Sequence, residues 1–287
     1  MLKLQTVLKS CVLLLISVLV SSCAILGDAG WQEPTARVLS SRLVALTPTT
    51  ARIDTQIEVT NPNLYAIALG ALDYQLSVNQ SRLLAGEQDR GNSIAAGASQ
   101  TITLPVELVF SEVFDLVSGL AQRESIAYRL DAGMGFDIPV IGRVRVPVAT
   151  EGEVPVPRLP QIRVSSLKAD RLSLSSADLT LTLAMDNPNI FGLLIDQFSY
   201  EFALDNNAVA SGDVRQRVRM EEKGQALIQV PITLSFLDAG MALYQAFLSG
   251  NSLDYGLAFE SRIGTTLPMM EAFPFSTVQD GRVQLRR

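Results

Sequence analysis

Very few side chains in this sequence are of the types that usually carry out catalysis or bind metal ions. The 287 residues include no His and only two Cys, and Lys168 and Lys223 are the only lysines beyond residue 9. His supplies the usual general base, and His and Cys supply the usual zinc ligands and nucleophiles. The acidic pair Glu221-Glu222 lies in polar, turn-like sequence, where carboxylates are normally solvated. We therefore expect a protein that is not an enzyme and that holds no metal and no cofactor.

Cys23 is the one residue for which a covalent role is expected. It ends the stretch Leu19-Val20-Ser21-Ser22-Cys23, which follows a basic segment with Lys3 and Lys9 and the apolar run 12–20. That run is too short to span a bilayer of about 30 Å and is typical of a secretion signal. The stretch resembles a bacterial lipobox, which implies cleavage before Cys23 and lipid on its sulfur and amine. The alternative is an ordinary signal peptide with a chance Cys at the cleavage position.

The charge balance after this cleavage limits the partners. Removal of Lys3 and Lys9 leaves 21 of the 23 basic residues against 29 acidic residues, a net charge of −8. Such a chain has no basic surface for nucleic acid. The expected partner is the membrane, which the chain reaches through its N-terminal lipid, and the expected location is the bacterial cell envelope. Ala24, rather than Asp, after Cys23 resembles lipoproteins of the outer membrane that face the periplasm.

The triplet Asn-Pro-Asn occurs twice, each time at the end of a strand-like pattern. Asn61-Pro62-Asn63 and Asn187-Pro188-Asn189 lie 126 residues apart, and the same offset aligns further identical residues without a gap. These are Arg37 with Arg163, Val38 with Val164, Leu46 with Leu172, Tyr74 with Tyr200, Gly86 with Gly212, Pro105 with Pro231 and Phe110 with Phe236. A register kept over this length indicates two copies of one structural unit.

Both units show the period of two that is typical of strands with one buried face. Apolar or small side chains alternate with polar ones over 53–59, and the second unit repeats this over 179–185. The next strand of each unit leads to a polar turn and a Gly, which predicts a hairpin. A third strand contains Pro105 or Pro231. Because proline donates no hydrogen bond, we expect these strands at sheet edges or bulged.

Each unit continues with one helix-like segment, for which Ser111 and Asp238 are the candidate N-caps. Two more strands are expected in each unit, around 125–132 and 143–149 and around 253–262 and 274–278. The alternating prolines of 154–160 predict an extended spacer between the units.

These patterns divide the chain into five parts. They are a signal peptide at 1–22, a lipidated tether at 23–36, a first domain at 37–153, a linker at 154–162 and a second domain at 163–287. The composition, 48% hydrophobic with a mean hydropathy of +0.26, indicates packed cores rather than a disordered chain.

The triplets themselves predict structural turns. Proline ends a ladder and fixes its own φ, and Asn bonds to nearby backbone groups. Ligand binding by the Asn amides is the alternative. Asp186 beside the second triplet could suggest calcium, but EF-hand spacing is missing and the first unit has Thr60 at this position, so no metal site is expected.

With its strand context, the repeated triplet resembles the late embryogenesis abundant type 2 domain, also called the water stress and hypersensitive response (WHy) domain. The resemblance covers 37–150 and 163–280, most specifically 51–86 and 177–212. It implies a mainly β fold of two tandem immunoglobulin- or fibronectin III-like β-sandwich domains, each with one short helix. This agrees with the several short strands of each unit. It also implies an association with desiccation and stress tolerance, and bacterial members are often lipoproteins.

Two kinds of function are compatible with these features. In the first, the domains are a folded binding or structural module that docks an envelope protein through strand edges or through the apolar loops 64–69 and 190–195. Those loops are either core or an exposed contact surface. In the second, the protein carries or senses a lipid or small apolar ligand between its sheets. Large side chains that fill the interior would argue against such a cavity, and they are Tyr74, Phe198, Tyr200 and Phe202.

Overall fold

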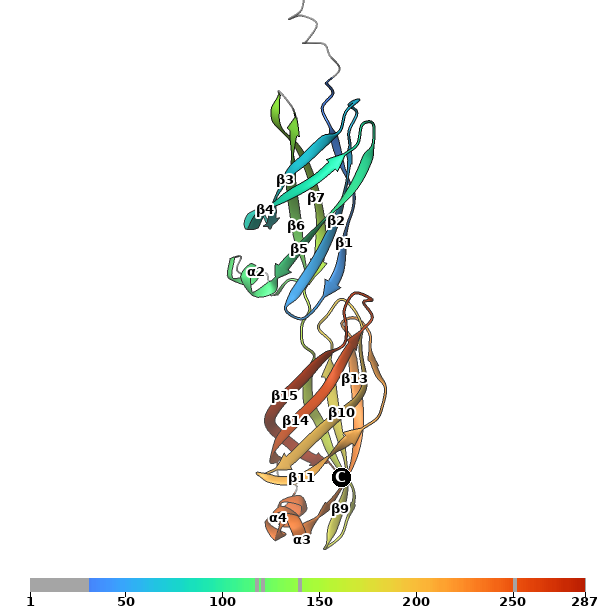
Figure 1. Cartoon of the computed structure of the whole chain (residues 1–287). Helices are drawn as coiled ribbons and strands as arrows, with labels where there is room; N and C mark the ends of the chain where they lie inside the picture. Colours follow the sequence, from blue (N-terminus) through green and yellow to red (C-terminus); the bar gives the residue numbers. More distant parts are fainter. Residues whose placement is uncertain (1–30, 117–118, 120–121, 139–140, 250–251, 287) are drawn as a thin grey trace, which may run out of the picture.

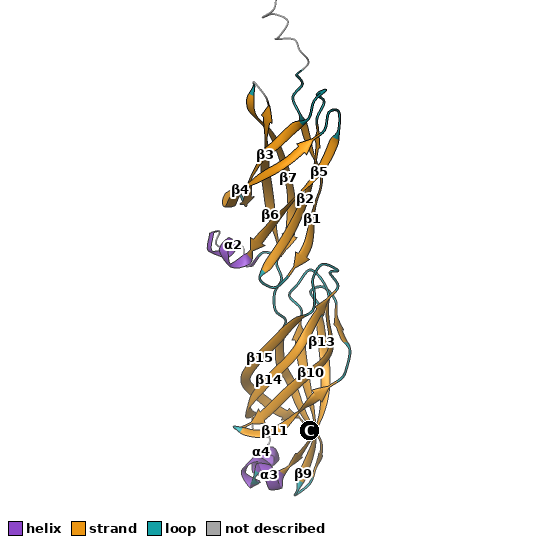
Figure 2. Ribbon diagram, in the orientation of Figure 1, coloured by secondary structure: helices purple, strands orange, loops and turns teal. Residues whose placement is uncertain are grey.

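Two stacks of strands follow one another along the chain (Figure 1). The computed structural model describes residues 31–116, 119, 122–138, 141–249 and 252–286. The expected signal peptide, the expected lipidation site Cys23 and most of the expected tether therefore lie outside the described residues. Figure 2 shows that strands make up most of both stacks, with short helices at one end of each.

The first domain is a sandwich of a three-stranded sheet, in the order β1-β2-β5, and a four-stranded sheet, in the order β4-β3-β6-β7. Its elements are β1 (Thr35–Leu46), β2 (Thr50–Thr60), β3 (Ile67–Val78), β4 (Ser81–Ile94), β5 (Ser99–Val109), α2 (Phe110–Leu116), β6 (Ser125–Ile138) and β7 (Gly142–Pro155). All neighbouring strands are antiparallel. This is the expected immunoglobulin- or fibronectin III-like arrangement.

The second domain repeats the arrangement, with β8-β9-β13 in one layer and β11-β10-β14-β15 in the other. A short parallel pairing of β15 with β8 joins the two layers at one edge, and β12 pairs with β10. Its elements are β8 (Gln161–Leu172), β9 (Ser176–Asp186), β10 (Leu193–Leu204), β11 (Asn207–Val214), β12 (Val218–Met220), β13 (Gln225–Ser235), α3 (Phe236–Ala239), α4 (Met241–Ser249), β14 (Ser252–Thr265) and β15 (Phe273–Arg286).

The alternating pattern of the sequence places one face of each strand in the core. In β2, Ile53, Thr55, Ile57 and Val59 are buried and the residues between them are not. The expected alternation over 53–59 is therefore confirmed. The offset of 126 also relates the bounds of the strands. Strands β2, β3 and β5 begin and end 126 residues before β9, β10 and β13, respectively.

The expected hairpins are present, and their turns explain the polar residues. Asn79 and Gln80 both have positive φ, 48° and 69°, and Asp205 and Asn206 repeat this with 45° and 64°. Two residues with positive φ form the turn whose twist matches that of paired strands. The proline strands are also confirmed as edges, because β5 pairs only with β2 and β13 only with β9.

The expected helix caps are wrong. Helix α2 begins at Phe110, so Ser111 is its second residue, and Asp238 lies inside α3. The backbone amides of Phe110 and Phe236 donate instead to the carbonyl oxygens of Thr49 and Ser175, both at 2.9 Å. The first residue of each helix is thus a buried Phe, 2% exposed in both domains. Its backbone amide is satisfied by a carbonyl oxygen of a neighbouring hairpin loop, rather than by a capping side chain.

The second domain has two helical segments where one was expected. Gly240, with φ of 90°, separates α3 from α4. Gly250, a residue type that commonly ends a helix, lies outside the described residues. Within the described part of the chain, no helix is both long enough and apolar enough to cross a bilayer.

Tyrosine and glycine face each other in four strand pairs. Tyr74 lies opposite Gly86 and Tyr128 opposite Gly152 in the first domain, and the second domain has Tyr200 with Gly212 and Tyr255 with Gly281. A Cβ at Gly152 would lie 2.6 Å from the Tyr128 hydroxyl oxygen. Gly86, Gly152 and Gly281 therefore leave room for a ring on the opposite strand, an arrangement that stabilises glycine in sheets, whereas a Cβ at Gly212 would make only an ordinary contact with Tyr200.

We expect Gly152→Ala to destabilise the first domain by about 1–3 kcal/mol, because Tyr128 is buried and cannot move aside without strain. Its hydroxyl is also hydrogen-bonded to Ser41 Oγ at 2.9 Å. Gly91→Ala is the control, since no atom lies within 4 Å of a Cβ there. Chemical denaturation followed by the fluorescence of Trp31, the single Trp of the chain, measures both variants. Equal stability of the two variants would contradict the steric argument.

Candidate functional site

The first Asn-Pro-Asn triplet joins three segments of the first domain. Asn61 is fully buried, and its Nδ2 donates to the carbonyl oxygens of Tyr65, Ile94 and Ala95 at 2.8–3.1 Å. Its Oδ1 accepts from both the backbone N and the Nδ2 of Asn63, each at 3.0 Å. Asn63 in turn donates from Nδ2 to Gln32 O and accepts from Gln32 N, both at 2.8 Å. We call Asn61 and Asn63, with these bonds, the first clamp.

The second triplet repeats these bonds 126 residues later, apart from the bond to Ile94. Asn187 donates to the carbonyl oxygens of Phe191 and Glu221, both at 2.8 Å. It accepts from the backbone N and the Nδ2 of Asn189 at 3.0 and 2.9 Å. Asn189 donates to Arg158 O at 2.8 Å and accepts from Arg158 N at 2.7 Å. Asn187 and Asn189 form the second clamp.

The clamps hold the segment through which each domain is attached to the preceding chain. Gln32 belongs to the expected tether and Arg158 to the expected linker. The side-chain amides of all four Asn residues are occupied by the protein's own backbone and by each other, so no Asn donor is left for a ligand. Pro62 and Pro188 are half-buried between the two members of each clamp, and Pro188 O accepts from Lys223 Nζ at 2.8 Å.

Backbone bonds and one ion pair link the two domains end to end. Strand β7 runs to Pro155 and β8 begins at Gln161, so the stretch without strand structure is 156–160. In this stretch Val156 N donates to Glu124 O at 2.9 Å. Elsewhere at the junction, the backbone amide of Leu46, at the end of β1, donates to Met269 O of the second domain at 3.0 Å. Leu46 and Met270 are both buried.

A salt bridge of 2.7 Å between Lys223 Nζ and Glu124 Oε1 crosses the same junction. The hydrogen bond and the charge of Lys223 lower the pKa of Glu124 below its ordinary value of 4.5. The pair therefore contributes to domain association above pH 4.5, and the contribution is lost as the pH falls through the lowered pKa.

We expect the two domains to move more independently at pH values below this pKa than at pH 7. The effect is small, because both side chains are exposed to solvent. Small-angle X-ray scattering measures the flexibility, and far-UV circular dichroism verifies that both domains remain folded. Lys223→Gln at pH 7 should reproduce the acid behaviour. A wild-type protein whose flexibility is the same at both pH values would contradict a role for the pair.

The loops after the two triplets, 64–69 and 190–195, differ in exposure although their sequences align. In the first domain Leu64 is 95% exposed and Tyr65 39%. In the second domain Ile190 is 37% exposed, and Phe191 and Leu193 are buried. Ile67 and Leu69 of the first loop are buried as well. The end of each loop is therefore part of the core, whereas Leu64 and Tyr65 form an exposed apolar tip in the first domain.

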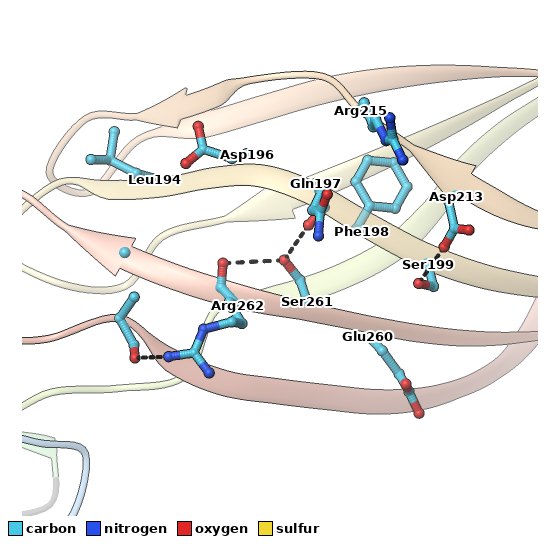
Figure 3. A pocket seen from close by; sticks show the side chains of 12 residues that line it. Leu194, Asp196, Gln197, Phe198, Ser199, Asp213, Arg215, Glu260, Ser261 and Arg262 are labelled. Atoms are coloured by element: carbon cyan, nitrogen blue, oxygen red, sulfur yellow. Dashed lines mark hydrogen bonds between the residues drawn. The ribbon is translucent and has the colours of Figure 1, made fainter.

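An open groove of about 680 Å³ lies on the outer side of β10 and β14 in the second domain (Figure 3). It forms where the pairing of β10 with β14 is interrupted between Ile195 and Phe198. Several of its polar groups are engaged with one another. Ser199 Oγ donates to Asp213 at 2.7 Å, Ser261 Oγ donates to Gln197 O at 2.8 Å and Arg262 donates to Ala272 O at 2.9 Å.

The groove offers little for catalysis. Its charged side chains, those of Asp196, Asp213, Glu260 and Arg262 among them, come from residues that are exposed, and solvated carboxylates are poor general acids at neutral pH. In the part of the chain that the structure describes, no three His, Cys, Asp or Glu side chains are grouped to hold a metal ion.

Large apolar side chains occupy the interior of the second sandwich. Phe198 and Phe202 are 2% and 1% exposed and Tyr200 is 8% exposed. Phe198 stacks on Phe259 with the ring centroids 4.9 Å apart, and burial raises the pKa of Tyr200. In the first domain, Tyr74 is only partly buried and packs against the core.

Sequence reasoning missed the two backbone partners of the clamps and the junction contacts. Gln32 and Arg158 are themselves related by the offset of 126, and this is the one signal that could have identified them. The hydrogen bond between Leu46 and Met269 joins main-chain atoms, and such a bond is not encoded by a side-chain pattern.

Comparison with known proteins places these features in a family. The family model for late embryogenesis abundant protein, LEA_2, matches residues 56–152 and 182–277, once in each sandwich. A desiccation-related protein of Arabidopsis thaliana is 29% identical over 104 residues, which are 36% of this chain and 63% of that protein. The chain thus covers less than two thirds of that relative. Lea14-A of Gossypium hirsutum is 22% identical over 134 residues, 47% of this chain and 89% of that protein.

A solved structure from Arabidopsis thaliana, determined in solution, is 23% identical to this chain, with a TM-score of 0.36. The match covers 46% of this chain and 86% of that one. The two family matches together cover more than half of the chain. The chain therefore belongs to the late embryogenesis abundant type 2 family, with two of its domains in tandem.

Proposed function

We propose that this protein is a membrane-anchored, non-enzymatic envelope lipoprotein whose two domains act as a folded structural and binding module. The observation that carries the proposal is the first clamp. Asn63 fixes the backbone of Gln32 with two hydrogen bonds, only nine residues after Cys23. A lipid on Cys23 would therefore hold the whole two-domain body at the membrane through a short connection.

The clamp chemistry supports a structural rather than a catalytic role. The repeated motif uses its amides to join strands, loops and the incoming chain, and Asn61 and Asn187 are buried. Lys168 pairs with Asp170 at 2.8 Å and Lys223 with Glu124, so both lysines of the described chain are engaged in ion pairs. A nucleophile activated by lysine or histidine has no basis in these residues.

A role in drying or envelope stress is proposed by analogy with the relatives. Several of them carry the description desiccation-related or desiccation protectant. Protectants that act while unfolded are hydrophilic and disordered, whereas this chain has a packed core. Protection by this protein would therefore depend on its folded surface and its place at the membrane.

The alternative, a carrier or sensor of lipid or a small apolar ligand, is less well supported. Phe198, Phe202 and Phe259 pack inside the second sandwich, where a ligand between the sheets would have to lie. The groove beside β10 is open, and most of the residues that line it are polar or charged, whereas sites for apolar ligands usually enclose the ligand in a concave, predominantly apolar surface.

The test uses the full chain expressed in a bacterium, with Cys23→Ser as the matched variant. The wild-type protein should fractionate with membranes, and its mass should show a mature N-terminus at residue 23 with attached lipid. Cys23→Ser should lack the lipid. Wild-type protein without lipid in a soluble fraction would overturn the proposal. Survival of drying with either form then tests the protective role, which predicts that only the lipidated protein helps the cells.

A further inference from the structure

The end of the first domain that lies away from the second domain is apolar and exposed. Leu64 is 95% exposed, Ile141 52% and Tyr65 39%. They belong to the β2–β3 and β6–β7 loops, and the β4–β5 loop at 95–98, Ala-Ala-Gly-Ala, lies beside them through its bonds to Asn61 and Asn63. We call the residues 61–66, 95–98 and 141–142 the outer pole. They contain no charged residue.

One of the corresponding loops of the second domain is charged, and it lies at the junction. The offset of 126 aligns 95–98 with Glu221-Glu222-Lys223-Gly224. The backbone is the same, because Gly97 and Lys223 both have positive φ, 65° and 52°. Lys223 pairs there with Glu124 of the first domain. The two loops thus share a backbone conformation but differ in charge. The loop that meets the other domain is charged, whereas the loop at the outer pole is not, although the chain as a whole is strongly acidic.

The described chain begins at this pole. Trp31 is half-buried, and the next residue, Gln32, is fixed by Asn63 of the outer pole. In Figure 1 the blue beginning of the chain lies at the end of the first domain that faces away from the second. Trp31 is the eighth residue after Cys23, and a fully extended chain spans at most about 28 Å between them. A lipid on Cys23 therefore keeps the outer pole close to the bilayer.

A bilayer surface matches this pole better than a second copy of the chain does. Uncharged loops with Leu, Tyr and Ile tips can be buried among headgroups at little cost, whereas charged loops cannot. Two of the other exposed apolar residues, Leu174 in the β8–β9 hairpin and Leu237 in α3, lie at the far end of the second domain (Figure 1). In a copy anchored in the same membrane, they would be a whole two-domain length away from the outer pole.

We propose that Leu64, Tyr65 and Ile141 insert into the interfacial region of the bilayer that holds the lipid of Cys23. The outer pole would then contact the membrane directly. This inference rests on the proposed lipid anchor. It adds a second, reversible contact to that anchor, and it fixes the orientation of the two domains relative to the membrane.

The experiment uses the mature full-length lipoprotein reconstituted in phosphatidylcholine vesicles that contain a nitroxide-labelled phospholipid. Leu64→Cys and Leu174→Cys are each labelled with an environment-sensitive fluorophore. In the mature protein the introduced Cys is then the only free thiol, because the sulfur of Cys23 carries lipid. The label at 64 should shift to the blue and lose most of its fluorescence to the nitroxide, and the label at 174 should do neither. Adding Leu64→Asp to an Ile141→Cys label should abolish the quenching of that label.

The outcomes separate the two proposals. Protein that carries lipid and floats with the vesicles, but whose label at 64 is not quenched, overturns the outer-pole contact and leaves the anchor intact. A blue shift at 64 without quenching means that protein covers the pole, and this also overturns the inference. Quenching at 174 equal to that at 64 overturns it as well. Protein that has no lipid and does not float overturns the proposed anchor, and the inference with it.

Discussion

Phe259→Ala should lower the free energy of unfolding of the second domain by about 3–5 kcal/mol, the usual cost of truncating a fully buried aromatic side chain. Phe259 is 0% exposed. Its ring lies 4.9 Å from that of Phe198 and 6.2 Å from that of Phe275, centroid to centroid, so the cavity would open between both neighbours. Since single domains are stable by only about 5–15 kcal/mol, this loss removes a large share of the stability of the second domain.

Denaturation of the full chain measures this loss with an internal reference. Far-UV circular dichroism follows both domains, whereas fluorescence of Trp31 reports on the first domain only, because it is the single Trp and packs on the first core. The dichroism transition should move to lower denaturant and the fluorescence transition should stay. Val278→Ala is the control, since Val278 is 72% exposed and should change stability by less than about 0.5 kcal/mol. A loss below about 1 kcal/mol for Phe259→Ala would contradict the packed interior.

Asn187→Ala should destabilise the second domain by about 2–4 kcal/mol, because unpaired buried polar groups cost about 1–3 kcal/mol each. The change leaves the carbonyl oxygens of Phe191 and Glu221 without this donor. It also removes the acceptor for the backbone N and Nδ2 of Asn189, a residue that is 2% exposed.

The offset of 126 supplies the matched variant. Asn61→Ala breaks the equivalent bonds in the first domain and should shift the transition seen by Trp31 fluorescence, whereas the transition of the second domain should stay. Asn92→Ala, at an exposed position of β4, should leave both transitions unchanged. If Asn187→Ala and Asn92→Ala had equal effects, the clamp would contribute nothing to stability, and the role of the triplet would have to be sought in ligand binding.

The sequence predicts what depends on local periodicity. The alternation over 53–59 identifies β2 because side chains on successive residues point to opposite faces of a sheet. The offset of 126 from β2 then predicts the position of β9 in the second unit. The turn residues Asn79 and Gln80 likewise identify a hairpin, since polar residues of this kind tolerate positive φ.

The sequence fails where tertiary contacts decide. Strand β6 continues to Ile138, well past the expected end at 132, because Gly133 and Gly135 interrupt the pattern without ending the ladder. The first turn of α2 is fixed by a bond from Phe110 N to Thr49 O, which no N-cap rule anticipates. The incoming residue of each clamp, Gln32 or Arg158, is bound through its main chain, and main-chain bonding leaves no mark on residue type.

The hydrogen-bond connections of the first clamp determine how the protein responds to mechanical force. Tension on the N-terminal segment reaches Gln32 and passes through two hydrogen bonds into Asn63 and then into Asn61. Asn61 follows β2 of one sheet and holds the carbonyl of Ile94, the last residue of β4 in the other sheet. The load is therefore shared by both sheets before it reaches β1, an edge strand that direct tension would peel away. The second clamp binds Arg158 between the domains with the same pair of hydrogen bonds, so the two attachments act in series along one line of pull.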